Sequence, residues 1–192
     1  PYKRLIDENR SRGKEVGEFE LIDTGIFDKD RYFDVFVEYA KADVEDILVR
    51  ITVANRGPSD AAVNLLPTVW FRNTWSWSGA EPDCELNSTE PGVIEIECED
   101  YGRRTLTCEG SPELLFTGNE TNNERLYNAE NTSPFVKDGI NNYLVSGKTR
   151  AVNPAKSGTK AAANYSLTVP AGGETVIRLR LSEPPRKKTA TK

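Results

Sequence analysis

The densest group of side chains with binding chemistry lies between residues 70 and 77. Trp70, Trp75 and Trp77 are all the tryptophans of the chain, and Arg72 and Asn73 lie between them. Indole rings stack on the apolar faces of sugars, while guanidinium and amide groups form directed hydrogen bonds to hydroxyls. This group therefore predicts a carbohydrate-contacting surface at a strand end. The alternative is that the rings pack within the sheet or against another domain, and the high average burial of tryptophan favours it.

A second polar group lies at residues 119–125. It supplies carboxylates, amides and a guanidinium that could bind a polyhydroxylated ligand, from Asn119, Glu120, Asn122, Asn123, Glu124 and Arg125. The alternative is a solvated helix start, with Thr121 as the N-cap and Glu124 completing a capping box. The sequence alone favours the helix start.

The chain lacks the residues that several classes of reaction need. The chain has no histidine, which excludes Ser-His triads, and its cysteines have no C-x-x-C spacing for zinc. Glycoside hydrolysis needs two carboxylates at a defined separation. Asp28, Asp30 and Asp34 are close in sequence only, and we interpret them as solvated turn carboxylates. We therefore expect no catalytic residue, no metal site and no cofactor in this chain.

Composition narrows the class of protein. The net charge of −5 argues against nucleic-acid binding as the main purpose, and the chain has no apolar run of membrane-spanning length. Cys84, Cys98 and Cys108 are an odd number. Free thiols in a reducing cytoplasm are therefore the favoured interpretation, although one pair could bridge neighbouring strands. Because the chain begins at Pro1 and contains no methionine, we expect a segment of a larger protein.

The elements that must position these groups are mostly strands. Tyr2, Leu5, Ile6 and Asn9 recur at helical spacing before Gly13, which predicts a short N-terminal helix. Period-two alternation then begins, because successive side chains of a strand point to opposite faces. Residues 31–40 carry an apolar face that we expect to be buried, formed by Phe33, Val35, Val37 and Tyr39.

Further strands follow, separated by turn residues. Residues 47–53 alternate and end at the turn 55–58; residues 63–73 contain Pro67, which indicates an edge or a bulge; residues 93–99 and 104–109 predict a hairpin; and residues 114–117 predict a short strand. From 118 to 158 only residues 143–145 suggest a strand. Residues 165–181 predict a final hairpin around a glycine-rich turn at 170–173.

This pattern predicts a mainly β fold: an antiparallel β-sandwich of the super-sandwich type, with a short N-terminal helix and a long irregular loop region. We expect one sandwich domain over residues 1–182. Residues 183–192, rich in proline and basic side chains, read as a linker or tail.

Four stretches resemble the N-terminal region of bacterial proteins related to glycoside hydrolase family 63. They are GIFDKDRYFDVFVEYAK at 25–41, LPTVWFRNTWSW at 66–77, NETNNERL at 119–126, and AVNP at 151–154 followed by GTKAAA at 158–163. The resemblance extends over most of the chain in the expected order. One position departs from it, because Asn164 stands where relatives have histidine.

The resemblance implies an N-terminal β-sandwich joined by a linker to an (α/α)6 barrel. That barrel carries the acid and base of an inverting α-glycosidase, and the relatives include glucosidases and mannosylglycerate hydrolases. On this basis the partner of the domain is the C-terminal barrel of the same chain. The two polar groups then lie at the domain interface or on the substrate side, where an oligosaccharide or glycoside would bind.

Two other functions stay open. An independent carbohydrate-binding module would bind sugar without the barrel, and a purely structural domain would bind none. The long region from 118 to 158 favours docking, because such a segment suits wrapping a neighbour better than forming a compact site.

Overall fold

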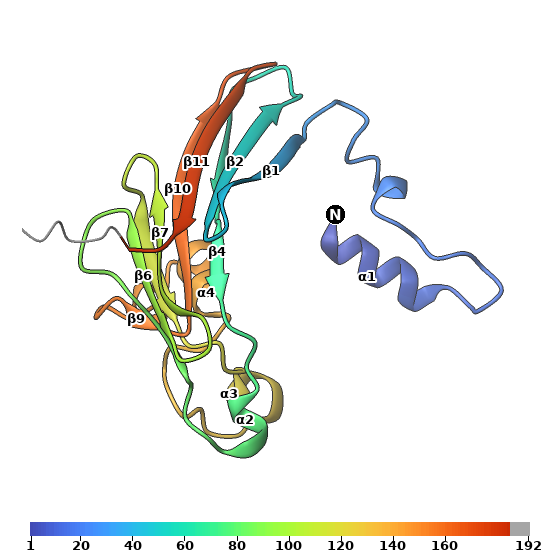
Figure 1. Ribbon diagram of the computed structural model, residues 1–192. Coiled ribbons are helices and arrows are strands. Elements are labelled where there is room, and N and C mark those ends of the chain that lie inside the picture. The colour runs from blue at the N-terminus through green and yellow to red at the C-terminus, as the bar shows by residue number, and fades with distance from the viewer. Residues whose placement is uncertain (185–192) are drawn as a thin grey trace, which may run out of the picture. The chain divides into compact units, whose positions relative to one another are not determined.

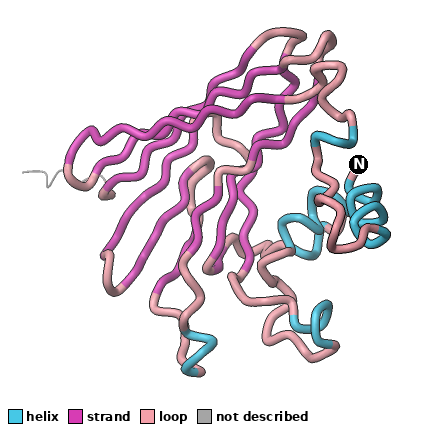
Figure 2. Tube along the Cα trace, turned by 90° about the vertical axis from the view of Figure 1, so that its right-hand side faces the viewer, coloured by secondary structure: helices cyan, strands magenta, loops and turns pink. Residues whose placement is uncertain are grey.

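The computed structural model describes residues 1–184, and the chain is mainly β (Figure 2). The end of the predicted linker, residues 185–192, lies outside the described residues. The strands are β1 Phe33–Asp43, β2 Asp46–Asn55, β3 Ala61–Leu65, β4 Thr68–Trp70, β5 Cys84–Asn87, β6 Val93–Cys98, β7 Gly102–Cys108, β8 Glu113–Thr117, β9 Ser157–Gly158, β10 Lys160–Val169 and β11 Glu174–Ser182. The helices are α1 Tyr2–Ser11, α2 Trp75–Ser78, α3 Asn123–Tyr127 and α4 Gly139–Ser146, with 3-10 turns η1 Ile22–Thr24 and η2 Thr149–Ala151.

The strands form two antiparallel sheets with sandwich-like packing, as predicted (Figure 1). The larger sheet has seven strands in the order β1-β2-β11-β7-β6-β5-β9. In the smaller sheet β10 lies between β3 and β4 and also pairs with β8. The final strands β10 and β11 therefore belong to different sheets. The prediction that they pair as a hairpin was wrong, because the glycine-rich turn carries the chain from one sheet to the other.

The chain divides into two compact units. The first comprises residues Pro1–Phe36, Ile51–Val63 and Thr168–Val176, and the second comprises Val37–Arg50, Asn64–Leu167 and the chain from Ile177 onward. Both polar groups of interest lie in the second unit.

In the first unit, α1 was predicted correctly, and Phe19 is the contact point of the N-terminal segment. Phe19 is 6% exposed, with the guanidinium groups of Arg4 and Arg12 over its ring at 5.0 and 4.9 Å. The Asn9 amide holds the Phe19 backbone through both its oxygen and its nitrogen, at 2.8 and 2.9 Å. These contacts fix one aromatic ring, whereas α1 itself has no buried residue.

In the second unit the interior strands bury alternate side chains. Leu86, Ile94 and Phe116 have no exposed surface, and the predicted hairpin of β6 and β7 is confirmed by its register from Val93↔Thr107 to Cys98↔Gly102. Ala161, Ala162 and Ala163 on β10 are fully buried. Three consecutive buried residues show that this strand is covered on both faces.

One of those covers is α4. Ile140 packs with Leu115 and Ala162, and Tyr143 and Leu144 lie against the same cluster. Residues 140, 143 and 144 share one helical face. The prediction of a strand at 143–145 was therefore wrong: the segment is helical, and its apolar residues have helical spacing when Ile140 is included.

The predicted interruption at Pro67 is confirmed, since β3 ends at Leu65 and β4 begins at Thr68.

Two of the three cysteines form a disulfide. Cys84 and Cys98 lie directly opposite each other on β5 and β6, with Cα atoms 4.1 Å apart. The interpretation of all three cysteines as free thiols was wrong for this pair. Cys108 is free and buried.

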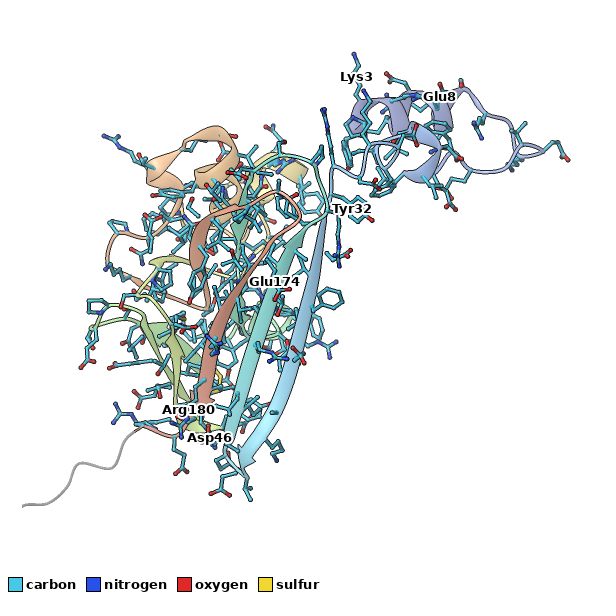
Figure 3. The ribbon with its side chains drawn as sticks, turned by 90° about the horizontal axis from the view of Figure 1, so that it is seen from above. Lys3, Glu8, Tyr32, Asp46, Glu174 and Arg180 are labelled. Carbon is cyan, nitrogen blue, oxygen red and sulfur yellow. A yellow bond between two sulfur atoms is a disulfide. The ribbon has the colours of Figure 1, made fainter. Side chains whose placement is uncertain are left out.

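The face of β1 that we expected to be buried is exposed. Val37 and Tyr39 are 46% and 72% exposed. β1 is the end strand of the larger sheet, so β2 is its one neighbour in that sheet among residues 1–184. Ion pairs support this end of the sheet, including Asp46 with Arg180, which the two labelled side chains show in Figure 3.

Candidate functional site

The tryptophan segment follows β4 and separates its three rings. Trp70 ends the strand and is 55% exposed, Trp75 begins α2 and is 7% exposed, and Trp77 is 73% exposed. The Asn73 side-chain oxygen accepts a hydrogen bond from the Ser76 backbone N–H at 3.1 Å, which shapes the start of α2. Gly79 then ends the helix at φ 68°, in the left-handed region that glycine adopts without strain. Trp70 and Trp77 are therefore exposed to solvent, whereas Trp75 is buried.

Hydrogen bonds join this segment to the second polar group. The Trp75 indole Nε1 donates to Glu120 Oε1 at 3.0 Å. The Asn119 amide donates to the Phe71 carbonyl at 2.8 Å, and the Asn73 amide donates to the Asn119 carbonyl at 3.4 Å. The structure therefore brings together two stretches that lie more than forty positions apart in the sequence.

The remainder of the second group builds α3 and its support. Asn122 is the N-cap, and its side-chain oxygen accepts from the Arg125 backbone N–H at 3.0 Å. The predicted helix start is present, but the predicted cap at Thr121 was wrong by one residue. The Asn122 amide and the Arg125 guanidinium both donate to the Asp138 carboxylate, at 3.1 and 3.0 Å.

A hollow of about 410 Å³ lies where the two groups meet. Its lining residues are Trp70, Asn73, Ser76, Trp77, Asn119, Thr121, Lys137 and Lys160. The volume is within the range of small-molecule sites. Two aromatic side chains, amides, hydroxyls and ammonium groups surround it, a set that can stack on a ring and hydrogen-bond its substituents.

Strand register places Lys160 beside the aromatic side chain. Lys160 on β10 is the direct partner of Trp70 on β4, and directly opposed residues share a face of the sheet. Its Nζ donates to the Lys137 carbonyl at 2.9 Å, and the Lys137 Nζ donates to Thr121 Oγ1 at 3.0 Å. Burial and the neighbouring Lys137 charge lower the pKa of Lys160, against an opposing effect of Asp138.

The predicted site residues divide by location. Trp70, Asn73, Trp77 and Asn119 line the hollow, and Arg72 lies outside its lining with its guanidinium 5.5 Å from the centre of the Trp77 ring. Glu120 lies at a separate hollow of about 320 Å³, and Glu124 at another of about 470 Å³.

The other predicted residues serve the local structure. Asn122 and Arg125 bind Asp138, and the Asn123 backbone N–H donates to the Asn131 side-chain oxygen at 2.7 Å. These three residues position α3 through contacts made within the chain.

Lys137 and Lys160 line the hollow but were not among the predicted site residues. Lys160 did carry a signal, since it directly precedes three alanines, and a lysine next to a buried apolar run usually has a partner. Lys137 carried none, because its place at the hollow depends on how residues 118–138 fold back.

Carboxylates elsewhere have structural partners. Asp34 forms an ion pair with Arg56 at 2.6 Å, and Glu113 accepts hydrogen bonds from Tyr143 at 2.6 Å and from the Asn164 amide at 3.0 Å. The Asn164 Oδ1 is buried without a hydrogen-bond partner. This is the position where the resemblance calls for histidine. Among residues 1–184 no group of three or more cysteine, aspartate or glutamate side chains could hold a metal ion.

No family model matches the chain. An uncharacterized protein of Saccharomyces cerevisiae, YMR196W, is 34% identical over 222 aligned positions, which cover 97% of this chain and 20% of the yeast protein. The chain thus spans about a fifth of the length of the curated relative it matches. Within residues 1–184 no helix is long and apolar enough to span a bilayer.

Proposed function

We propose that this chain is a non-catalytic β-sandwich domain of a larger glycoside hydrolase. It docks on an (α/α)6 catalytic barrel and helps to form the substrate entrance. The observation that supports this most directly is the exposure of Trp70 and Trp77 beside a polar hollow of about 410 Å³. All lining residues of the hollow except Lys137 belong to stretches that resemble family 63 relatives.

The relative's length fits this role. A protein that continues well beyond the matched fifth has room for a separate catalytic domain. Exposed aromatic surface is also more common at interaction sites than on the free surface of monomers. The parent reaction is then hydrolysis of an α-linked glycoside by carboxylates of the barrel, with the domain contributing contacts at the edge of the site.

An independent carbohydrate-binding module is the second candidate. It is favoured by the fact that all lining residues of the hollow come from one compact unit of this chain. Such a module would bind sugar with unchanged affinity when the barrel is absent. A purely structural docking domain would bind no sugar in either state.

The predicted cytoplasmic location stays a prediction. It depended on free thiols, and the Cys84–Cys98 disulfide removes two of the three cysteines from that argument.

The test compares hydrolysis of a panel of α-linked glucosides by this chain and by the longer protein. We expect turnover only by the longer protein. In that protein, Trp70→Ala and Trp77→Ala should lower kcat/KM by roughly tenfold, in the range of lost stacking contacts. Tyr101→Ala is the matched control, since Tyr101 is 65% exposed in the turn between β6 and β7. Turnover by the chain alone would contradict a supporting role.

A further inference from the structure

We propose that the hollow beside Trp70 and Trp77 binds a saccharide that carries an anionic group, a carboxylate or a phosphate. The sugar ring contacts the indoles, and the anionic group lies between the Lys137 and Lys160 ammonium groups. The saccharide part of this ligand rests on the proposed function, whereas the anionic part follows from the charges of the lining.

The charged side chains that line the hollow are all of one sign. Lys137 and Lys160 line it, and no lining residue is acidic. A concave site lined by one sign of charge attracts ligands of the opposite sign. A neutral glycoside would accept only ordinary hydrogen bonds from the two ammonium groups, whereas an anionic one would gain charge-assisted hydrogen bonds as well.

The two lysines have no carboxylate partner of their own. Within the described part of the chain every ion pair involves an arginine, and neither Lys137 nor Lys160 forms one. Asp138, whose charge acts on Lys160, already accepts hydrogen bonds from Arg125 and Asn122. A charged lysine that is partly removed from water is stabilised when an anion replaces the lost solvation.

The hydrogen bonds of the lysines also leave donors available. Each ammonium group carries three N–H donors. Lys160 donates to the Lys137 carbonyl and Lys137 donates to Thr121 Oγ1, and each of these bonds uses one donor. The bonds fix both groups at the edge of the hollow without neutralising their charge. Charge-assisted hydrogen bonds to a carboxylate or phosphate would satisfy the remaining donors.

The aromatic side of the hollow suits a ring. Trp70 is the strand partner of Lys160, so an indole and an ammonium group lie next to each other on one face. Trp77 has the Arg72 guanidinium over one ring face and is still 73% exposed. A ligand with an apolar ring face and an anionic substituent would use both kinds of group at once, and inorganic phosphate would use only one.

The experiment titrates this chain with four probes by calorimetry, supported by tryptophan fluorescence: glucose, glucuronate, glucose 6-phosphate and inorganic phosphate. We expect the two anionic sugars to bind at least about tenfold more tightly than glucose and than inorganic phosphate. The double variant Lys137→Gln/Lys160→Gln should lose that preference. Lys41→Gln/Lys148→Gln, which removes two exposed lysines outside the hollow, should keep it.

Equal affinity for glucose and glucuronate, or binding that survives the loss of Lys137 and Lys160, would overturn the anionic assignment. Inorganic phosphate binding as tightly as glucose 6-phosphate would overturn the saccharide part, and so would binding that is unchanged by Trp70→Ala. Circular dichroism of each variant checks that it folds.

The binding experiment and the hydrolysis test can fail independently of each other. Anionic sugar binding by the chain, together with a longer protein that cleaves no α-glucoside, would refute the proposed parent activity and leave the site intact. Cleavage by the longer protein without any probe binding here would refute the site alone.

Discussion

Strands β6 and β1 have the same alternating pattern and opposite surroundings. On β6 the apolar residues Ile94 and Ile96 are 0% and 6% exposed, whereas on β1 Val37 and Tyr39 are 46% and 72% exposed. β6 lies between β5 and β7 in the sheet, and β1 is the end strand. The inner strand therefore has a hydrogen-bonded neighbour on each side, and the end strand has one on a single side.

The difference teaches that alternation determines a strand and its two faces, while sheet position determines what covers them. An apolar face on an end strand is a surface that another part of a longer protein can cover. Three measurements would break or sharpen this comparison.

The largest expected effect comes from truncating one residue on each strand. Ile94→Ala removes a fully buried side chain and should lower the free energy of unfolding by about 2–5 kcal/mol. Val37→Ala should lower it by less than about 0.5 kcal/mol, because the side chain is already half in water. Urea denaturation followed by circular dichroism measures both. Similar losses for the two variants would mean that the β1 face is covered in solution.

The next largest effect is a dependence of the folding stability on pH, caused by Cys108 at the end of β7 beside β6. Burial raises the pKa of this thiol to about 11, from an ordinary value of 9.0. Between these values the unfolded chain loses the proton while the folded chain keeps it. Stability is therefore complete below about pH 9 and falls as pH rises toward 11, by on the order of 1–2 kcal/mol.

Urea denaturation from pH 7 to 10.5 measures this dependence in wild type and in Cys108→Ala. The variant should lack the part of the slope that belongs to the thiol. An identical slope in both proteins would show that Cys108 reaches solvent in the folded chain.

The smallest expected effect is a shift in the pKa of Glu38 on the exposed strand β1. A hydrogen bond from Arg50 on β2 lowers the pKa of Glu38 on β1, with the Arg50 charge acting in the same direction against some desolvation. The stability that the Glu38–Arg50 pair contributes is fully present above the pKa of glutamate in the unfolded chain. It is lost as the pH falls through the lowered pKa of Glu38 in the folded chain. Both side chains are more than half exposed, so salt should screen the pair.

An NMR titration of Glu38 tests this interaction. Arg50→Gln should raise the Glu38 pKa toward its ordinary value, and high salt should do the same in wild type. Arg180→Gln, which removes the partner of Asp46, is the control and should leave Glu38 unchanged. A Glu38 pKa that does not respond to Arg50→Gln would contradict the pairing on this edge.

The candidate site could be predicted in part. Local composition indicated the two stretches at 70–77 and 119–125, because clustered aromatic and amide side chains are visible in any short window. Their junction through Asn73, Asn119 and Glu120 could not be predicted, since it joins residues more than forty positions apart. The same holds for Lys137, whose place in the hollow depends on that junction.

By itself the sequence determined the mainly β fold, the N-terminal helix, the β6–β7 hairpin and the break at Pro67, because each depends on local periodicity or on one residue's backbone chemistry. Only the tertiary structure decided which apolar faces are buried, that β10 and β11 belong to different sheets, and that Trp75 is internal while Trp77 is exposed. These outcomes depend on contacts between distant segments. A local pattern specifies the direction of a side chain but not the neighbour that it meets.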